Sequence, residues 1–243
     1  MIISDVKNLL LRTCYGRKRP EEGFSIICVY NDPGKLDRYL VSSLKNQVCP
    51  FELLTIDNTR GQHRSAGKIL NKTARKAQFP YLVFIHQDVA ILSPHWLRGA
   101  IRMLSGLKRC GAAGVAGRTA SGIVTDVIHG SPPVPAGKVL SGEPVESQTL
   151  DGCLMIVPRT LFEQVAFDEA LEGWYLYVAG YCLDLVRLGY KNYVIPSSIY
   201  HESDGPANPA VFEKAKEHLI NKHRGFIDII YTTIGIWTIS PRD

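Results

Sequence analysis

The chain has 243 residues, of which 45% are hydrophobic and 21% charged, and its formal net charge at pH 7 is +5. These values are ordinary for a globular protein, and a chain of this length can bury a core without disulfides or metal staples. The small and dispersed positive charge suits an anionic small molecule or a membrane surface, and it argues against a nucleic-acid-binding protein.

The first ordered element is expected after a loose N-terminal lead-in. Residues 1–23 contain the basic cluster "RKRP" at 17–20 and show no clear periodicity. The β-branched apolar run "FSIICVY" at 24–30 predicts a buried strand. Apolar side chains then recur at helical spacing, so an amphipathic helix is expected over 35–47.

Strands and helices continue to alternate after this helix. "FELLTID" at 51–57 predicts a second strand, and a polar, basic loop follows it at 58–64. Residues 65–77 show the pattern of a helix. "YLVFI" at 81–85 predicts a third strand, and residues 93–104 a further helix.

The segment 118–150 interrupts this alternation. It follows a small-residue strand at 111–117 and is rich in Gly, Pro, Ser and Thr, so we expect a long loop with a functional purpose. Regular structure is expected again afterwards, as a strand and helix at 150–165, a helix at 179–189, strands at 191–196 and 198–201, and a closing amphipathic helix at 209–224.

The alternation of strands with helices predicts an α/β fold with a mostly parallel, doubly wound central sheet and helices on both of its faces. We expect one domain over 24–208, with a C-terminal helix and apolar tail, 209–243, packed on it. The apolar stretch 225–237 is too short to span a bilayer, and Asp228 interrupts it.

The six cysteines lack CxxC spacing, and several lie inside apolar patterns. Buried, reduced thiols are the favoured interpretation, and with no apolar signal core after Met1 they indicate a cytoplasmic protein. The charge of +5 is also compatible with a peripheral position at the inner face of a membrane.

Acidic side chains stand at the ends of two predicted strands. Asp57 ends the second strand, and Asp88 follows the third in "YLVFIHQDV". Ligands of open α/β sheets bind at the carboxyl ends of the strands. His201, which closes "SIYH", is a third candidate, and Asp88 with His201 would suit Mg²⁺ or Mn²⁺ carrying phosphate oxygens.

Two common nucleotide-binding motifs are missing from the sequence. There is no GxxxxGK[ST] and no GxGxxG after the first strand, which argues against a P-loop enzyme and a nicotinamide enzyme. A nucleotidyltransferase would need a Gly- and Lys/Arg-rich loop there, and "NDPGKLDR" fits that pattern poorly.

Five motifs in register carry a resemblance to a known family. They are "FSIICVYND", "LLTIDN", "YLVFIHQDV", "LDGCLMIVPR" and "FDEALEGWYLY" followed by "CLDLVRLGY". Together they resemble the family-2 glycosyltransferases of the GT-A (Rossmann-like) fold, and in particular the family-2-like branch that includes the streptomycin-biosynthesis glycosyltransferase-like domain, where HQD replaces DxD. The resemblance covers about residues 24–205.

The resemblance implies a role for each matching residue. The donor would be a UDP-, GDP- or dTDP-sugar, and the acceptor hydroxyl would belong to a glycan, a lipid-linked molecule or a small molecule. Mn²⁺ or Mg²⁺ on the diphosphate would be held by Asp88 and His201. The residues implied at the nucleotide are Val29, Tyr30, Asn31, Asp57 and His86.

The resemblance does not identify a catalytic base. Val178 and Gly180 stand where the family has carboxylates, so the sequence leaves Asp151 and Glu172 as candidates for a base in an inverting transfer. Without a base, the chain would be a degenerate module that only binds nucleotide sugars.

Less specific roles stand beside these hypotheses. Asp57 could merely stabilise the turn at "DNT", and His86 could orient its neighbours rather than bind a ligand. His201 could be an ordinary histidine at a strand end. Trp174, Tyr175 and Tyr177 could stack on a sugar ring or pack in the core.

Overall fold

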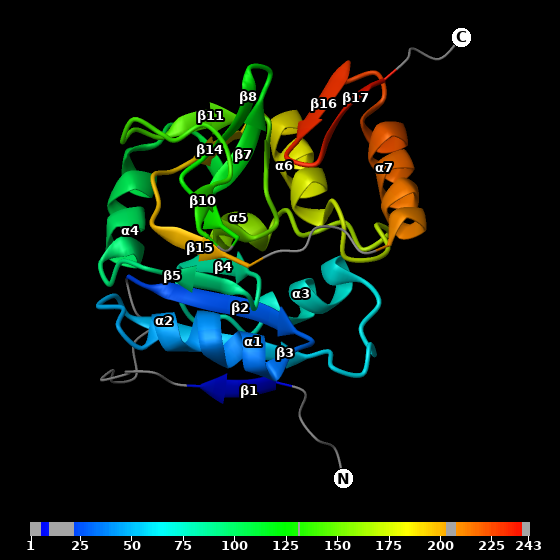
Figure 1. Cartoon of the computed structure of the whole chain (residues 1–243). Helices are drawn as coiled ribbons and strands as arrows, with labels where there is room; N and C mark the ends of the chain where they lie inside the picture. Colours follow the sequence, from blue (N-terminus) through cyan, green and yellow to red (C-terminus); the bar gives the residue numbers. More distant parts are fainter. Residues whose placement is uncertain (1–5, 10–21, 131, 203–207, 240–243) are drawn as a thin grey trace.

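The computed structural model describes residues 6–9, 22–130, 132–202 and 208–239. Its centre is an eight-stranded sheet with the order β1-β3-β2-β4-β13-β6-β14-β11 (Figure 1). The bounds of these strands are β1 Val6–Leu9, β2 Phe24–Tyr30, β3 Phe51–Asp57, β4 Tyr81–Ile85, β6 Cys110–Gly114, β11 Val145–Ser147, β13 Leu154–Pro158 and β14 Lys191–Val194.

The sheet is mixed, whereas the sequence predicted a mostly parallel one. The pairs β2–β3, β2–β4 and β6–β14 are parallel. Strand β13 runs antiparallel between β4 and β6, and β1 and β11 pair antiparallel at the two edges. An apolar run shows that a strand is buried but not which way its neighbours run, so the direction of β13 could not be read from its sequence.

Helices cover both faces of the sheet, as predicted. Along β2, Ile26 and Cys28 pack into one apolar cluster and Ile27 into the other, because successive side chains of a strand point to opposite faces. The helical elements are α1 Pro33–Lys35, a π-helical turn Leu36–Val41, α2 Ser42–Leu44, α3 Ala66–Ala74, α4 Trp96–Gly106, α5 Arg159–Phe162, α6 Tyr177–Arg187 and α7 Pro209–His223.

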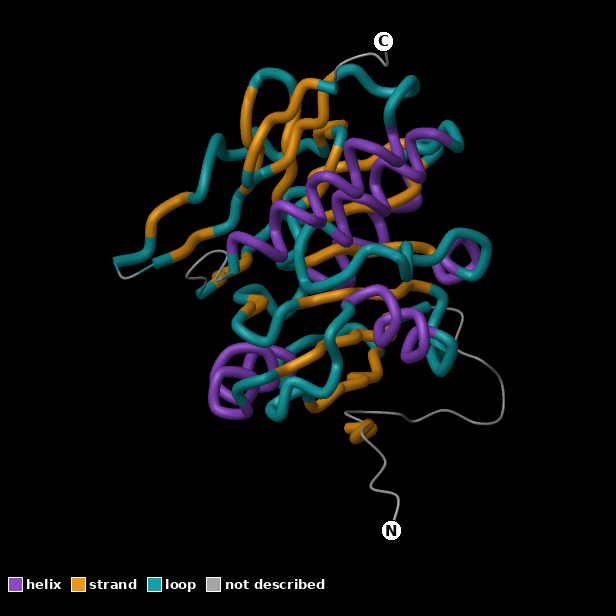
Figure 2. The backbone as a smooth tube through the Cα atoms, turned by 90° about the vertical axis from the view of Figure 1, so that its right-hand side faces the viewer, coloured by secondary structure: helices purple, strands orange, loops and turns teal. Residues whose placement is uncertain are grey.

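Short strands occupy much of 118–150, which the sequence predicted to be a long loop, and all of their pairings are antiparallel except β9 with β15. They build two small sheets, with the orders β10-β9-β15-β5 and β12-β7-β8. In Figure 1 the labelled strands of these sheets lie beside the central sheet, and Figure 2 shows all strands, in orange, from a second side. Their strands are β5 Val89–Ile91, β7 Ala116–Thr119, β8 Gly122–Thr125, β9 Ile128–His129, β10 Val134–Pro135, β12 Thr149–Leu150 and β15 Ile199–His201.

Both ends of the chain contribute structure to the domain. Strand β1 lies within 1–23, expected as a loose lead-in, and pairs with β3; the basic cluster 17–20 lies outside the described residues. The apolar tail forms the hairpin β16 (Ile229–Thr232) and β17 (Gly235–Thr238), beside α6 and α7 in Figure 1. Among the described residues, no helix is long and apolar enough to cross a membrane.

Helix α7 is attached to the domain by a charged cluster. The Lys222 ammonium lies 2.8 Å from Asp168 Oδ2 and 2.8 Å from Asp184 Oδ2, and His218 Nε2 lies 2.9 Å from Asp168 Oδ2. Burial works to raise the pKa of Asp168, but hydrogen bonds from Lys222 and His218 outweigh it and hold that pKa well below its ordinary value.

We therefore expect acid to weaken this attachment. Because the folded-state pKa of Asp168 is lower than the unfolded value of 3.8, its stabilising contribution is complete above that pH and is lost as the pH falls below it. Asp168→Asn should lower the free energy of unfolding by about 1–3 kcal/mol at pH 6, and by less at pH 3. Urea unfolding of both proteins at the two pH values checks this; an equal difference at both would contradict it.

Candidate active site

Two adjoining cavities lie at the carboxyl ends of β2 and β4. The smaller, about 250 Å³, is lined by residues that include Val29, Tyr30 and Asn31. The larger, about 560 Å³, lies between the 116–136 segment and the C-terminal hairpin. His86, Trp174 and Tyr177 line both cavities, so a ligand in one would contact a ligand in the other across this boundary.

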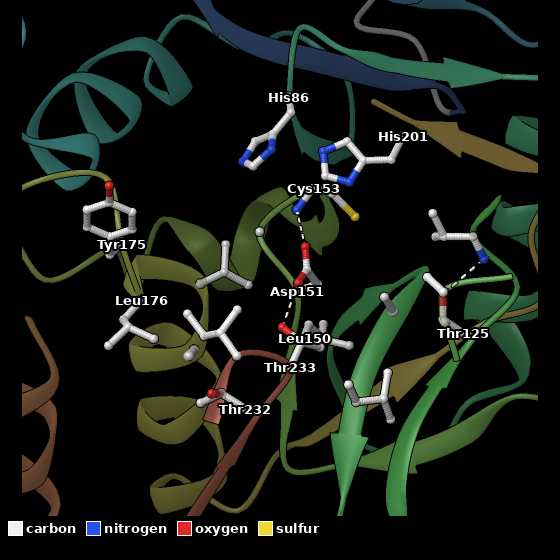
Figure 3. A pocket seen from close by; sticks show the side chains of 18 of the residues that line it. His86, Thr125, Leu150, Asp151, Cys153, Tyr175, Leu176, His201, Thr232 and Thr233 are labelled. Carbon is white, nitrogen blue, oxygen red and sulfur yellow. Dashed lines mark hydrogen bonds between the residues drawn. The ribbon is translucent and has the colours of Figure 1, made fainter. Parts of the chain in front are cut away.

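Three side chains that could bind a metal converge at this boundary. One ligand atom each from His86, Asp88 and His201 can be chosen so that all three lie within 4.8 Å of one another. His201 Nε2 lies 3.5 Å from Asp88 Oδ1, and the rings of His86 and His201 lie next to each other in Figure 3, tilted by 57° with centroids 5.5 Å apart. The sequence predicted Asp88 and His201 as metal ligands and placed His86 at the nucleotide.

The electrostatics of the cluster suit a cation. Burial lowers the pKa of His86, and the neighbouring His201 lowers it further, so the His86 imidazole is neutral and can offer a lone pair. Burial works to raise the pKa of Asp88, but His201 outweighs it and keeps the carboxyl ionised. Among the residues that the structure describes, the buried His201 Nε2 has no hydrogen-bond partner, as expected of an atom whose partner would be a ligand.

The three residues are brought together by different strands. His86 and Asp88 lie in the turn between β4 and β5, and His201 ends β15, which pairs antiparallel with β5 so that His201 is opposite Val89. The amide of His86 also donates to the Cys153 carbonyl (2.9 Å), which fixes the turn against the start of β13. A pairing between strands so far apart in the sequence is not visible in local patterns.

Gln87, the middle residue of "HQD", has a role that sequence reasoning missed. Its Oε1 accepts hydrogen bonds from the amides of Asn31 and Asp32, both at 2.9 Å, and its Nε2 donates to Asn31 Oδ1 at 2.6 Å. These bonds hold the loop after β2 at the mouth of the smaller cavity. The position of Gln87 between His86 and Asp88, two candidate ligands, was the feature of the sequence that could have indicated this role.

Removing this amide should loosen the smaller cavity. We expect Gln87→Ala to weaken nucleotide binding about 5- to 10-fold, since two backbone donors lose their acceptor at a net cost of about 1 kcal/mol. Gln87→Glu keeps the acceptor oxygen and should weaken binding less. Calorimetric titration with UDP and GDP checks the order of the two variants; equal affinities for wild type and Gln87→Ala would contradict it.

Asp57 is engaged in its own turn and is not among the residues that line the smaller cavity. Its Oδ1 accepts from the Thr59 amide (2.9 Å) and hydroxyl (2.8 Å), and these bonds lower the pKa of Asp57. It also accepts a hydrogen bond from Tyr30, which does line the cavity. In the structure Asp57 stabilises the turn at "DNT" and reaches the smaller cavity only indirectly, through Tyr30. Its neighbour Asn58 lines the cavity instead.

Asp151 is the one carboxylate among the described residues that line the larger cavity. Its Oδ2 accepts from the Thr233 hydroxyl (2.6 Å) and its Oδ1 from the Cys153 amide (2.9 Å), as drawn in Figure 3. Burial works to raise the pKa of Asp151, but these two hydrogen bonds outweigh it and keep the carboxyl ionised.

Neither Glu172, the second candidate for the base, nor Asp184, the acid on α6 closest in sequence to Val178 and Gly180, lines either cavity. Glu172 is exposed and is not among the residues lining either cavity. Asp184 is bound to Lys222 on the face of α6 that meets α7. Val178 lines the larger cavity, whereas a side chain at Gly180 would meet Leu219 of α7.

A sequence model of the "Glycosyltransferase like family" matches residues 26–203, which is most of the chain. The chain belongs to this family. A protein described as "ATP synthase subunits region ORF 6" from Fuscovulum blasticum is 25% identical over 210 residues, which are 83% of this chain and 83% of that protein.

Solved structures of glycosyltransferases share the fold. GalNAc-T7 with UDP, GalNAc and Mn²⁺ matches with a TM-score of 0.61 and 12% identity, over 84% of this chain and 48% of that one. The mannosyltransferase PcManGT from Pyrobaculum calidifontis, with GDP-Man and Mn²⁺, matches at 0.54 and 14%, over 78% and 59%. TarS from S. aureus with UDP-GlcNAc matches at 0.54 and 13%, over 82% and 66%.

These matches establish a GT-A fold for this glycosyltransferase-like chain, as the sequence predicted. The chain spans only about half of GalNAc-T7 and 59% of PcManGT. The narrower likeness to the streptomycin-biosynthesis branch is not tested by them and stays a prediction. The matched range contains His86, Asp88, Asp151 and His201, but it ends before Thr233.

Proposed function

We propose that the chain transfers a sugar from a nucleotide-diphosphate donor to an acceptor hydroxyl, in a metal-dependent and inverting reaction. The observation that carries this proposal is the convergence of His86, Asp88 and His201 at the boundary of two cavities at the carboxyl ends of the strands. The neighbours' complexes with UDP, GDP-Man and UDP-GlcNAc support a nucleotide-sugar donor.

The donor set supports Mn²⁺ over Mg²⁺. Both ions were expected from the sequence, but Mg²⁺ prefers oxygen ligands, and the cluster offers two imidazoles and one carboxylate. When bound, such an ion stabilises the negative charge of the departing diphosphate as a Lewis acid. His86, Asp88 and His201 would hold it, with the smaller cavity receiving the nucleotide.

The residues of this chain would share the remaining tasks. Val29, Tyr30 and Asn31 would contact the nucleotide, with the Asn31 loop held by Gln87. The Asp151 carboxylate would take the proton of the acceptor hydroxyl. The acceptor oxygen would form a bond to the sugar carbon, while the bond from that carbon to the diphosphate oxygen breaks. The diphosphate would leave with the electron pair. A carboxylate oxygen has two lone pairs, so Asp151 Oδ2 can still accept a proton while bound to Thr233.

A second candidate function is a nucleotide-sugar-binding module without catalysis. Two observations favour it: the family's expected carboxylate is replaced by Val178 in the larger cavity, and both oxygens of Asp151 already accept hydrogen bonds. The two candidates differ in turnover but share the donor site.

A donor panel separates the two candidates. Incubation with UDP-GlcNAc, UDP-GalNAc, GDP-mannose and dTDP-glucose, with glucose, glycerol and n-hexyl β-D-glucoside as acceptor hydroxyls, should release the nucleotide from one donor in the presence of Mn²⁺, and more slowly with Mg²⁺. His201→Ala should abolish the release. Binding of a nucleotide sugar without any release by the wild-type protein would favour the binding module, and neither binding nor release would contradict both candidates.

A further inference from the structure

The larger cavity has a composition that restricts what it can hold. No lysine or arginine is among the described residues that line it, and its one carboxylate, Asp151, is already hydrogen-bonded twice. Much of the wall is aliphatic and includes Ile123, Val127, Leu150 and Ile234. An anion placed against this wall, away from the metal cluster, would lose its hydration without gaining a lysine or arginine partner, which is unfavourable.

One group of lining side chains lies next to the candidate metal cluster. His86, which also lines the smaller cavity, lies near His201 and Asp151 in Figure 3. Aliphatic residues from the segment 116–136, from Leu150, from the start of α6 and from the hairpin turn line the remainder, together with His129 and the uncharged hydroxyls of Thr125, Thr232 and Thr233. A ligand with a hydroxyl at one end and an apolar body would match this division, because few polar groups then fix its orientation within an apolar wall.

The hairpin that forms one wall is fixed to the rest of the domain by side-chain hydrogen bonds. Gln148 accepts from the Tyr231 amide (2.7 Å) and donates to the Ile229 carbonyl (2.9 Å). Thr149 donates to the Tyr231 carbonyl (2.6 Å), and Thr233 in the turn donates to Asp151 (2.6 Å). The turn is therefore held against the cavity by the strand that precedes Asp151.

This wall lies outside the part of the chain that the family model matches. The match ends at residue 203, and Thr232, Thr233 and Ile234 all line the cavity. The hairpin therefore gives this chain a binding surface that its family membership does not assign.

We infer that the larger cavity binds an uncharged acceptor with an apolar body, and that the turn of the β16–β17 hairpin forms one wall of the binding site. The inference rests on the proposed function, because it assigns the acceptor side of the same site. The acceptor hydroxyl would lie near Asp151, and the apolar body would extend between Ile234 and the 123–127 segment.

Three small probes test the class of ligand. n-Hexyl β-D-glucoside is neutral with an apolar chain, n-hexyl phosphate carries the same chain with an anion, and glucose lacks the chain. In calorimetric titrations of the full chain in EDTA, which keeps a bound metal from attracting the phosphate, hexyl glucoside should bind at least about 10-fold more tightly than the other two. Binding of hexyl phosphate as tightly as hexyl glucoside, or no binding of hexyl glucoside, would overturn the inference.

Two isoleucines of the same hairpin provide a matched pair of variants. Ile234 is 46% exposed and lines the cavity, whereas Ile236 is 48% exposed and is not among its lining residues. Both positions should tolerate a charge without unfolding. Ile234→Asp should weaken hexyl glucoside binding about 10-fold, and Ile236→Asp should leave it within about twofold. Equal effects of the two changes would show that the turn is not a wall of the site.

A nucleotide titration on the same samples separates failure of this inference from failure of the proposed function. UDP and GDP, titrated with Mn²⁺, report on the smaller cavity, which Ile234 does not line. Nucleotide binding without the expected hexyl glucoside binding would overturn the acceptor inference alone. Absence of nucleotide binding would overturn the proposed function, whatever the glucoside does.

Discussion

Replacing Asp88 with asparagine is expected to weaken Mn²⁺ binding by at least about 100-fold. Asp88 supplies the one negative charge among the three candidate ligands, and it lies 3.5 Å from His201 Nε2 with only 16% of its side chain exposed. Loss of a residue that merely supports a metal ligand typically costs about 10- to 100-fold in affinity, so loss of a charged ligand should cost more. Electron paramagnetic resonance of free Mn²⁺ during a titration measures the change.

Asp57→Asn is the matched control for this variant. Both acids follow strands of the central sheet, but Asp57 bonds to Thr59 and is not part of the metal cluster. The control should bind Mn²⁺ within about twofold of wild type, whereas Asp88→Asn should not. Equal Mn²⁺ affinity of Asp88→Asn and wild type would contradict the assignment of a metal site to Asp88 and its neighbours.

Asp151→Asn is expected to lower the rate of sugar transfer by about 10²- to 10⁴-fold, the usual contribution of a general base. Nucleotide affinity should change little, because Asp151 lines the larger cavity and not the smaller one. The measurement is the rate of nucleotide release from the donor that the wild-type protein uses, together with calorimetric titration of its nucleotide. A rate within about twofold of wild type would exclude Asp151 as the base.

Variants of Thr233 test whether this residue positions the Asp151 carboxylate. Thr233→Val removes the hydroxyl that donates to Asp151 Oδ2 while keeping the shape of the side chain. We expect kcat to fall about 10-fold with little change in KM for the donor, since a hydrogen bond to a charged group contributes about 1.5–3 kcal/mol. Thr233→Ser should restore most of the rate. A loss that serine does not rescue would assign Thr233 a packing role only.

Local sequence patterns were sufficient to predict the positions of several strands of the central sheet. The predicted strands 24–30 and 51–57 match β2 and β3, because their β-branched apolar runs are buried on both faces of the sheet. The direction of β13 and the small strands within 118–150 could not be predicted in this way. Those strands are two to four residues long and depend on pairing with distant segments, so they leave no periodicity of their own.

The site shows the same division between local and distant information. Asp88 and His201 could be proposed because each stands at a strand end, and the structure brings them together with His86. The contact of Thr233 with Asp151 could not be foreseen, because it joins residues 82 positions apart through a hairpin that the sequence showed only as an apolar tail. Glu172 was considered for its position near the family's acidic motif, which does not determine where a loop side chain points.

The most direct test of the account is calorimetric titration of the full chain with UDP, GDP and dTDP, in Mn²⁺ and in EDTA. We expect one nucleotide to bind in Mn²⁺, EDTA to abolish the binding, and Asp88→Asn to abolish it while Asp57→Asn retains it. Failure of every nucleotide to bind in Mn²⁺, or binding that is unchanged by EDTA and by Asp88→Asn, would contradict the assignment of His86, Asp88 and His201 to a metal-diphosphate site.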